Sequence, residues 1–174
     1  MATLKYRDKI DRAYGLTGMS VCMCLMESEQ FIRLVDLDAE ADYGMEFTPD
    51  FYQARNQGLS AKAVWRGNLE RFRLLTGLVV ANTMCRALVR NREEVGRELS
   101  DLLLRHLQAE ADELCSLQSD ETRSLFAESF NFFHRVFTHP QVSAIVEEFV
   151  EQLQAKRRLE SEAVIHILRP LIGA

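Results

Sequence analysis

The chain has little proline and little glycine, with 3 Pro and 8 Gly among 174 residues. These two residues interrupt helices and form tight turns more strongly than any others, so their scarcity favours long helices with few turns. The sequence also lacks a clear run of alternating apolar and polar residues, the pattern typical of a half-buried strand. Its content of 47% hydrophobic and 27% charged residues is ordinary for a globular protein. We therefore expect an all-α fold.

Short motifs of common catalytic and nucleotide-binding sites are missing as well. The chain contains no G-x-x-x-x-G-K-[ST] loop, no G-x-G-x-x-G loop and no G-x-S-x-G turn. Its 4 cysteines lie in apolar or helical stretches, not in the dense pattern of a disulfide framework. These absences argue against an enzyme and against a cofactor. They favour a reduced, cytoplasmic chain.

Clustered positive charge is also absent. The net charge is −5; residues 1–91 carry 12 Lys and Arg against 11 Asp and Glu, whereas residues 92–174 carry 9 against 15. Nucleic-acid binding needs Lys and Arg clusters that displace counterions from phosphates. The connector over 36–50 is acidic too, which argues against a DNA-binding helix-turn-helix in the N-terminal region. We expect no nucleic-acid partner.

The longest stretches without charge cover 13–26 and 74–85. Both are shorter than the roughly 20 apolar residues that span a bilayer, so we expect no membrane span.

Helical periodicity divides the chain into about seven or eight helices. A central helix over about 61–91 is apolar nearly all round between 74 and 89, which is typical of a helix covered by its neighbours. We predict a single-domain helical bundle over 1–174 around this central helix. Residues 1–47 would form N-terminal helices and an acidic connector, and 48–174 the main bundle.

Caps and helix-breaking residues place the expected boundaries. Gly15 is expected to end a first helix over 4–14, and the next helix is expected to run to about Asp38. Thr48 and Pro49 fit an N-cap and a first helical residue. Further helices are expected over 92–117, 119–138, 141–156 and 160–171.

The segment MSVCMCLM is rich in sulfur. On a helix, Cys22 and Cys24 are separated by about 200° and cannot share a metal. Helical geometry instead aligns Met19, Cys22, Met23 and Met26 on one face. Such a stripe could hold Cu(I), which prefers soft ligands. Packing in the core, in an apolar pocket or at an interface is the favoured interpretation, because Met fills gaps and free Cys is usually buried.

His106 falls within the apolar stripe of its predicted helix, and Glu110 follows one turn later. A histidine and a carboxylate at this spacing can bind one cation, as in bundles of the ferritin type. The chain has no Glu-x-x-His motif, however, and a third ligand would have to come from His134 or Glu128. A histidine hydrogen-bonded to a carboxylate at a half-buried helix contact is the simpler interpretation.

Four phenylalanines recur at helical spacing: Phe126, Phe130, Phe133 and Phe137. They fall within about 60° of one another on a helix. They could line a pocket for an apolar ligand. Core packing is favoured, because aromatic side chains supply large buried areas.

The basic residues of the central helix form no pronounced patch. Arg86 and Arg90 share a face and lie near Glu93 and Glu94, so this region is mixed in sign. Such charges usually form a solvated helix surface with ion pairs. A basic groove for an acidic partner is the weaker alternative.

The apolar stripes exceed what one core absorbs, and no catalytic site is recognisable. The first hypothesis is therefore a non-enzymatic helical protein that acts through protein–protein contacts, as a homodimer or with another protein. One alternative is a metal-binding bundle with a site at His106 and Glu110. A further alternative is a carrier of an apolar ligand in a Phe-lined pocket.

Overall fold

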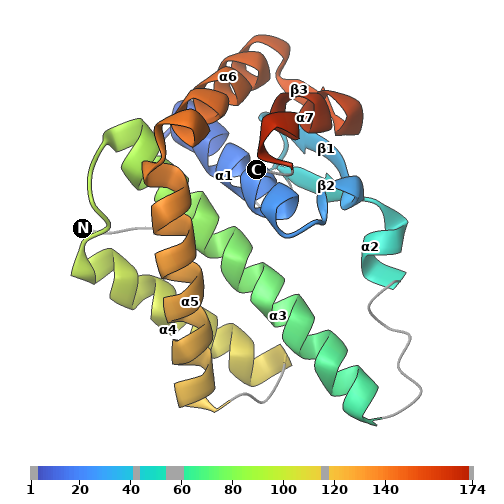
Figure 1. Ribbon diagram of the computed structural model, residues 1–174, viewed down its shortest axis with the longest axis vertical. Helices are drawn as coiled ribbons and strands as arrows, with labels where there is room; N and C mark the ends of the chain where they lie inside the picture. The colour runs from blue at the N-terminus through green and yellow to red at the C-terminus, as the bar shows by residue number, and fades with distance from the viewer. Residues whose placement is uncertain (1–3, 41–43, 54–60, 115–117, 173–174) are drawn as a thin grey trace.

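A computed structural model describes residues 4–40, 44–53, 61–114 and 118–172 (Figure 1). Within these ranges the chain forms seven α-helices and a small sheet, so the all-α class is confirmed. The helices are α1 (Lys9–Leu25), α2 (Pro49–Gln53), α3 (Ala61–Met84), α4 (Arg97–Leu114), α5 (Ser119–Thr138), α6 (Pro140–Lys156) and α7 (Ser161–Leu168). The strands are β1 (Ile32–Asp36), β2 (Met45–Phe47) and β3 (Arg158–Glu160).

The long α3 helix is the centre of the fold, as predicted. It continues through a π-helical segment, Cys85–Asn91, so the central helical run covers the expected 61–91. α4 and α5 lie along one side of it, and α1 packs on the other, covered in turn by α6, α7 and the sheet (Figure 1). The segment Arg66–Asn91 is long and apolar enough to cross a membrane by length and composition alone, with mean hydropathy 1.4. Of its most apolar window, 72% is buried inside the fold, as in the core helix of a globular protein.

α1 runs without a break through Gly15, so the predicted helix end at this residue is wrong. Gly15 and Gly18 lie on the side of α1 that faces α3. A Cβ atom on Gly18 would lie 2.4 Å from the carbonyl oxygen of Ala81 and 2.7 Å from the Cβ of Cys85. Because these glycines have no side chain, the two helix backbones approach closely. These two glycines allow α1 and α3 to pack closely, and neither of them ends the helix.

The predicted helix to Asp38 is also wrong, because α1 ends at Leu25. Glu27 adopts a left-handed conformation with φ of 51°. The amide of Glu27 donates to the carbonyl of Cys24 at 3.1 Å, and the amide of Ser28 donates to that of Met23 at 2.8 Å. This is the hydrogen-bond pattern of a Schellman motif, and it turns the chain out of the helix.

The chain then enters β1, which the sequence pattern does not predict. β1 is the middle strand of an antiparallel sheet with the order β2-β1-β3. The register of β1 against β2 shifts between Ile32 and Leu34, so Ile32 and Val35 are both buried although they lie three residues apart. The shift removes the two-residue alternation by which a strand is recognised in a sequence.

Other boundaries agree with the sequence. α2 begins at Pro49, as predicted. A C-terminal cap at Gly58, which the sequence also predicts, lies outside the described residues. α5 ends at Thr138, and α6 begins at Pro140, where the ring Nδ1 of His139 accepts a hydrogen bond from the amide of Gln141 at 3.3 Å.

Gly18→Ala is expected to destabilise the fold by about 1–3 kcal/mol, because the added methyl group meets the α3 backbone, which cannot rotate away. Urea unfolding followed by circular dichroism measures the change. Gly96→Ala is the matched control. Nothing lies within 4 Å of a Cβ atom at Gly96, so this variant should lose less than about 1 kcal/mol. Equal losses in the two variants would show that the α1–α3 approach does not require a glycine.

Candidate functional site

The middle of the sulfur-rich stripe of α1 faces the interior, whereas Met19 is half-buried and Met26 is exposed. Cys22 and Met23 are fully buried, and the Cys22 thiol lies 3.6 Å from the sulfur of Met26. Gly77 of α3 lies against this pair, since a Cβ atom there would be 3.0 Å from the Cys22 sulfur. Cys24 is on another side of α1, with its sulfur 3.8 Å from the carbonyl oxygen of Leu168. The two cysteines therefore contact different helices.

The described thiols are protected from reaction. Burial raises the pKa of Cys22 and of Cys85 far above the ordinary range of a thiol. Burial, with a smaller effect of the nearby Glu29 carboxylate, raises the pKa of Cys24 to about 11. All three are therefore protonated near neutral pH, whereas the thiolate is the form that attacks electrophiles and binds metals. Cys115 lies outside the described residues.

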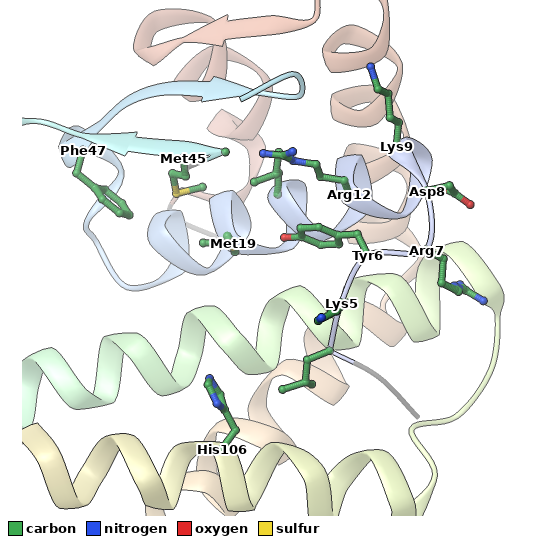
Figure 2. Close-up of a pocket in the computed structure, with 13 residues that line it drawn as sticks. Lys5, Tyr6, Arg7, Asp8, Lys9, Arg12, Met19, Met45, Phe47 and His106 are labelled. Carbon is green, nitrogen blue, oxygen red and sulfur yellow. The ribbon is translucent and has the colours of Figure 1, made fainter. Parts of the chain in front are cut away.

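His106 points outward from α4. Leu103, Leu107 and Ala111 form the buried face of this helix, and His106 lies about 100° from the middle of that face. The side chain is exposed, not half-buried as the stripe had suggested. It contributes to the wall of a wide groove between α1 and α4 (Figure 2).

Among the described residues, the structure brings no further metal ligand to His106 and Glu110. In the described part of the chain, no three His, Cys, Asp or Glu side chains are grouped so that they could hold a metal ion. Of the two suggested third ligands, His134 has its Nε2 atom 2.9 Å from Glu94, and Glu128 is exposed on α5. The metal hypothesis thus rests on two neighbouring side chains of α4.

The phenylalanine stripe of α5 forms part of the core. Phe126, Phe133 and Phe137 are buried, and Phe130 is half-buried beside them. Ring centroids are 5.5 Å apart for Phe126 and Phe130 and 6.2 Å apart for Phe133 and Phe137. The neighbouring Phe132 lies outside the stripe, and 40% of its surface is exposed.

Phe132 borders an apolar groove, which we name the α5–α6 groove. Its volume is about 510 Å³. Val136 of α5, Val142 and Ile145 of α6, and Leu171 after α7 contribute most of its apolar surface. The side chains of Arg135 and His139 also line the groove, as do Leu25, Gln141 and Pro170. A groove of this kind can accept an apolar side chain of a partner.

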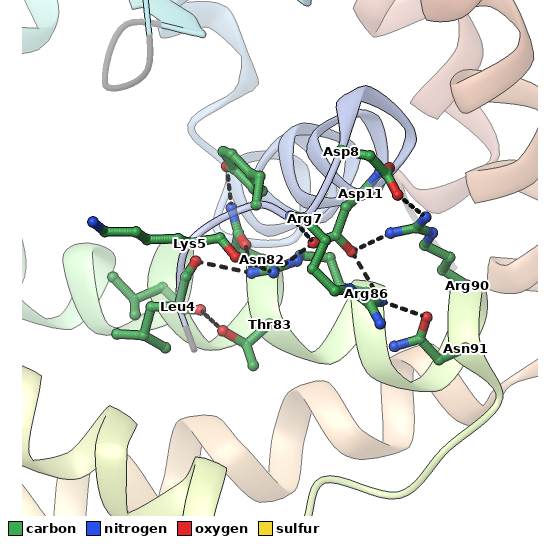
Figure 3. Close-up of polar contacts among 12 residues, drawn as sticks. Leu4, Lys5, Arg7, Asp8, Asp11, Asn82, Thr83, Arg86, Arg90 and Asn91 are labelled. Atoms are coloured by element: carbon green, nitrogen blue, oxygen red, sulfur yellow. Dashed lines mark hydrogen bonds and ion pairs between the residues drawn. The ribbon is translucent and has the colours of Figure 1, made fainter. Parts of the chain in front are cut away.

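A cluster of buried charges connects α1 to the end of the central helix (Figure 3). The side chain of Asp11 has no exposed surface. Its carboxylate lies 2.6 Å from Arg86 and 2.5 Å from Arg90 of the π-helical segment. Arg90 also pairs with Asp8 at 2.7 Å, and the Arg7 amide donates to Asp11 at 3.0 Å.

Arg86 in addition holds the N-terminal segment against α3. It donates to the carbonyl oxygens of Leu4 at 3.1 Å and Lys5 at 2.9 Å, and its guanidinium lies 5.1 Å from the ring centroid of Tyr6. Asn82 completes the contact by donating to the Tyr6 hydroxyl at 2.7 Å. Arg86 thereby sets the position of the chain before α1.

The expectation that Arg86 is part of a solvated surface is wrong, since only 8% of its side chain is exposed. The N-terminal segment and α1 cover it, and the pairing of Arg86 with Asp11 joins residues 75 positions apart. One sequence signal was available. Asp11 lies in line with Gly15 and Gly18 at i, i+4 and i+7, which places a carboxylate on a helix face otherwise made of small residues.

Comparison with protein-family models, with curated proteins and with solved structures gives no match to this chain. Any function has to be argued from the geometry of the described residues.

Asp11→Asn is expected to lower the free energy of unfolding at neutral pH by about 3 kcal/mol or more, because two arginines would keep buried charges without a carboxylate. Asp101→Asn, at an exposed position of α4, is the control and should change it little. Chemical denaturation of the three proteins gives the comparison.

The same variant should alter the response to acid. Burial on its own would raise the pKa of Asp11, but hydrogen bonds from Arg86, from the Arg7 amide and from Arg90 lower it well below the usual value. The stabilisation is therefore complete above the unfolded-state pKa of about 4 and is lost as the pH falls below it. Unfolding measured between neutral and acidic pH should depend less on pH in Asp11→Asn than in the wild type. An unchanged acid profile would contradict this assignment.

Proposed function

We propose that this chain is a non-enzymatic helical protein that acts through protein–protein contacts, and that the α5–α6 groove is the interface of a homodimer. The supporting observation is the distribution of exposed apolar side chains. In the part of the chain that the structure describes, four large hydrophobic residues are exposed: Ile10, Met26, Phe132 and Ile172. Phe132 lines the groove, and Met26 and Ile172 directly follow its lining residues Leu25 and Leu171. Clustered apolar exposure of this kind is typical of an interaction surface.

A second copy of the chain suits this surface. A two-fold dimer brings the same surface of each subunit together, so a surface that offers both a projecting side chain and a groove is self-complementary. Phe132 projects beside the groove that its counterpart would enter. Aromatic side chains, phenylalanine among them, are also enriched at protein–protein interfaces relative to the rest of the surface.

The charges around the groove fit the same arrangement. Arg135 lies on the α5 side of the groove, and the exposed Glu148 follows the groove residue Ile145 by three positions on α6. Residues three apart share a helix face. A two-fold axis perpendicular to α6 would reverse the direction of this helix, so that Arg135 of each subunit could approach Glu148 of the other.

Sedimentation velocity over a range of concentrations tests the dimer. The wild type is expected to sediment at twice the 20.0 kDa of the chain at tens of micromolar. Phe132→Glu should sediment as a monomer, because a carboxylate replaces the central apolar contact. Ile10→Glu makes the same change at an exposed residue outside the groove and should leave the dimer intact.

Phe132 and Ile10 are both exposed, so both variants should keep the circular dichroism spectrum of the wild type. A wild-type protein that stays monomeric over the whole concentration range would refute the homodimer. A dimer that persists in Phe132→Glu would refute the α5–α6 groove as its interface.

A further inference from the structure

A second groove lies between the N-terminal segment, α1, the strand β2 and α4; we name it the α1–α4 groove (Figure 2). Its volume is about 990 Å³. Small-molecule sites usually have volumes of about 300–1,000 Å³, so the α1–α4 groove can hold a sizeable ligand. It is separate from the α5–α6 groove and shares no lining residue with it.

The floor of the α1–α4 groove is apolar. Leu16 and Met19 come from α1, and Met45 and Phe47 from β2. Leu16 and Met45 are buried by the core, while Met19 and Phe47 remain half-buried at the groove. Leu4 of the N-terminal segment adds a further aliphatic group. Such a surface can cover a hydrocarbon chain.

Basic side chains line the groove beside this floor. Lys5, Arg12 and His106 reach the groove from the N-terminal segment, α1 and α4 respectively (Figure 2). Among the described lining residues, one carboxylate is present, that of Asp8, and it pairs with Arg90. Lys9 pairs with Asp38 at 2.8 Å, and Arg7 pairs with Asp11 at 3.3 Å.

Arg12 is the cation best placed to receive an anion. Its Nη2 group donates to the carbonyl oxygen of Glu40 at 2.9 Å, and within the described ranges it forms no ion pair. Among the described residues its Nε–H group, which is shielded from solvent, has no hydrogen-bond partner. A guanidinium without an ion pair can donate charge-assisted hydrogen bonds to a carboxylate or a phosphate.

Gly44 keeps the wall open beside Arg12. A Cβ atom at this position would lie 2.7 Å from Leu16 Cδ2 and 3.1 Å from Arg12 Nη2. Any other residue would press on the place where the charged and the apolar parts of the groove meet. Since Gly44 precedes β2, the sheet directly shapes this place.

We propose that the α1–α4 groove binds an anionic amphiphile with a single hydrocarbon chain. The carboxylate or phosphate head would be held by Arg12, with Lys5 and His106 as further basic groups of the groove wall, and the chain would lie on the floor formed by α1 and β2. The net charge of the whole chain is −5, so a positively charged groove with an apolar floor is a local property and not a consequence of composition. The α1–α4 groove therefore selects a ligand that has both an acidic group and an apolar part.

Isothermal titration calorimetry with four probes tests the ligand class: dodecanoate, monododecyl phosphate, neutral monolauroylglycerol and inorganic phosphate, each below its aggregation concentration. Both chain-bearing anions are expected to bind with one molecule per chain. The neutral lipid should bind at least about tenfold more weakly, because it makes no charge-assisted hydrogen bonds. Inorganic phosphate should give no measurable heat, because it makes no contact with the floor.

Two substitutions on α4 test the site. His106→Glu places a negative charge in the groove and is expected to weaken dodecanoate binding at least about tenfold. Arg105→Glu makes a larger change of charge at the adjacent exposed residue, which does not line the groove, and should leave the affinity within about twofold. Both positions are exposed, so neither substitution is expected to destabilise the fold. Arg12→Gln should also weaken binding by about tenfold or more, since it removes the guanidinium that donates to the head group.

Several results would overturn the proposal. Equal affinity for the neutral lipid would show that the basic side chains do not select the ligand. Binding of inorganic phosphate as tight as that of monododecyl phosphate would show that the floor takes no part. Equal effects of His106→Glu and Arg105→Glu would show that the anion binds elsewhere. Binding to phosphatidylglycerol vesicles without binding of the dissolved probes would point to a membrane surface instead.

Discussion

The ion pairs of a fully buried carboxylate, Asp11, hold the structure together where its first helix meets its central one. Removing three charged side chains from water is costly, and the cost is offset here by short contacts from two arginines and by a backbone amide. Arg86 also donates to the carbonyls of Leu4 and Lys5. The same interaction therefore joins α1 to the π-helical segment and positions the segment before α1. A π-helical turn is often found where a helix has to present special side chains, and here it presents Arg86 and Arg90.

α1 meets a different environment on each of its sides. The side with Asp11, Gly15 and Gly18 lies against α3 so closely that only small residues fit between the backbones. The side with Lys9, Arg12, Leu16 and Met19, spaced i, i+3, i+7 and i+10, lines the α1–α4 groove. Leu25, the last residue of α1, lines the α5–α6 groove, and the exposed Met26 follows it directly. One helix thus positions both proposed binding surfaces, and the cluster at its N-terminus determines how it lies on α3.

Sequence reasoning predicted those features that depend on near neighbours in the chain. The central helix over 61–91, the start of α2 at Pro49 and the boundary at His139 and Pro140 all follow from periodicity and from the chemistry of proline. It failed where residues distant in the sequence determine the local structure. Gly15 does not end α1 because α3 fills the space beside it, and β1 is unrecognisable because a register shift hides its alternation and its partner β3 comes much later. The contact of Asp11 with Arg86 joins residues 75 positions apart. In the sequence it is indicated only by a carboxylate in line with two glycines.

The pairing of β1 with β3 has a consequence for how the protein is made. The ion pair between Asp36 and Arg158 connects residues 122 positions apart. A ribosome adds about 5–20 residues per second, so roughly 6–24 s pass between the synthesis of the two strands. During this time β1 has a free edge, and α6 and α7, which pack on α1, do not yet exist. A nascent chain in this state presents an open strand and an apolar helix, the two features that chaperones bind, until its last helices leave the ribosome.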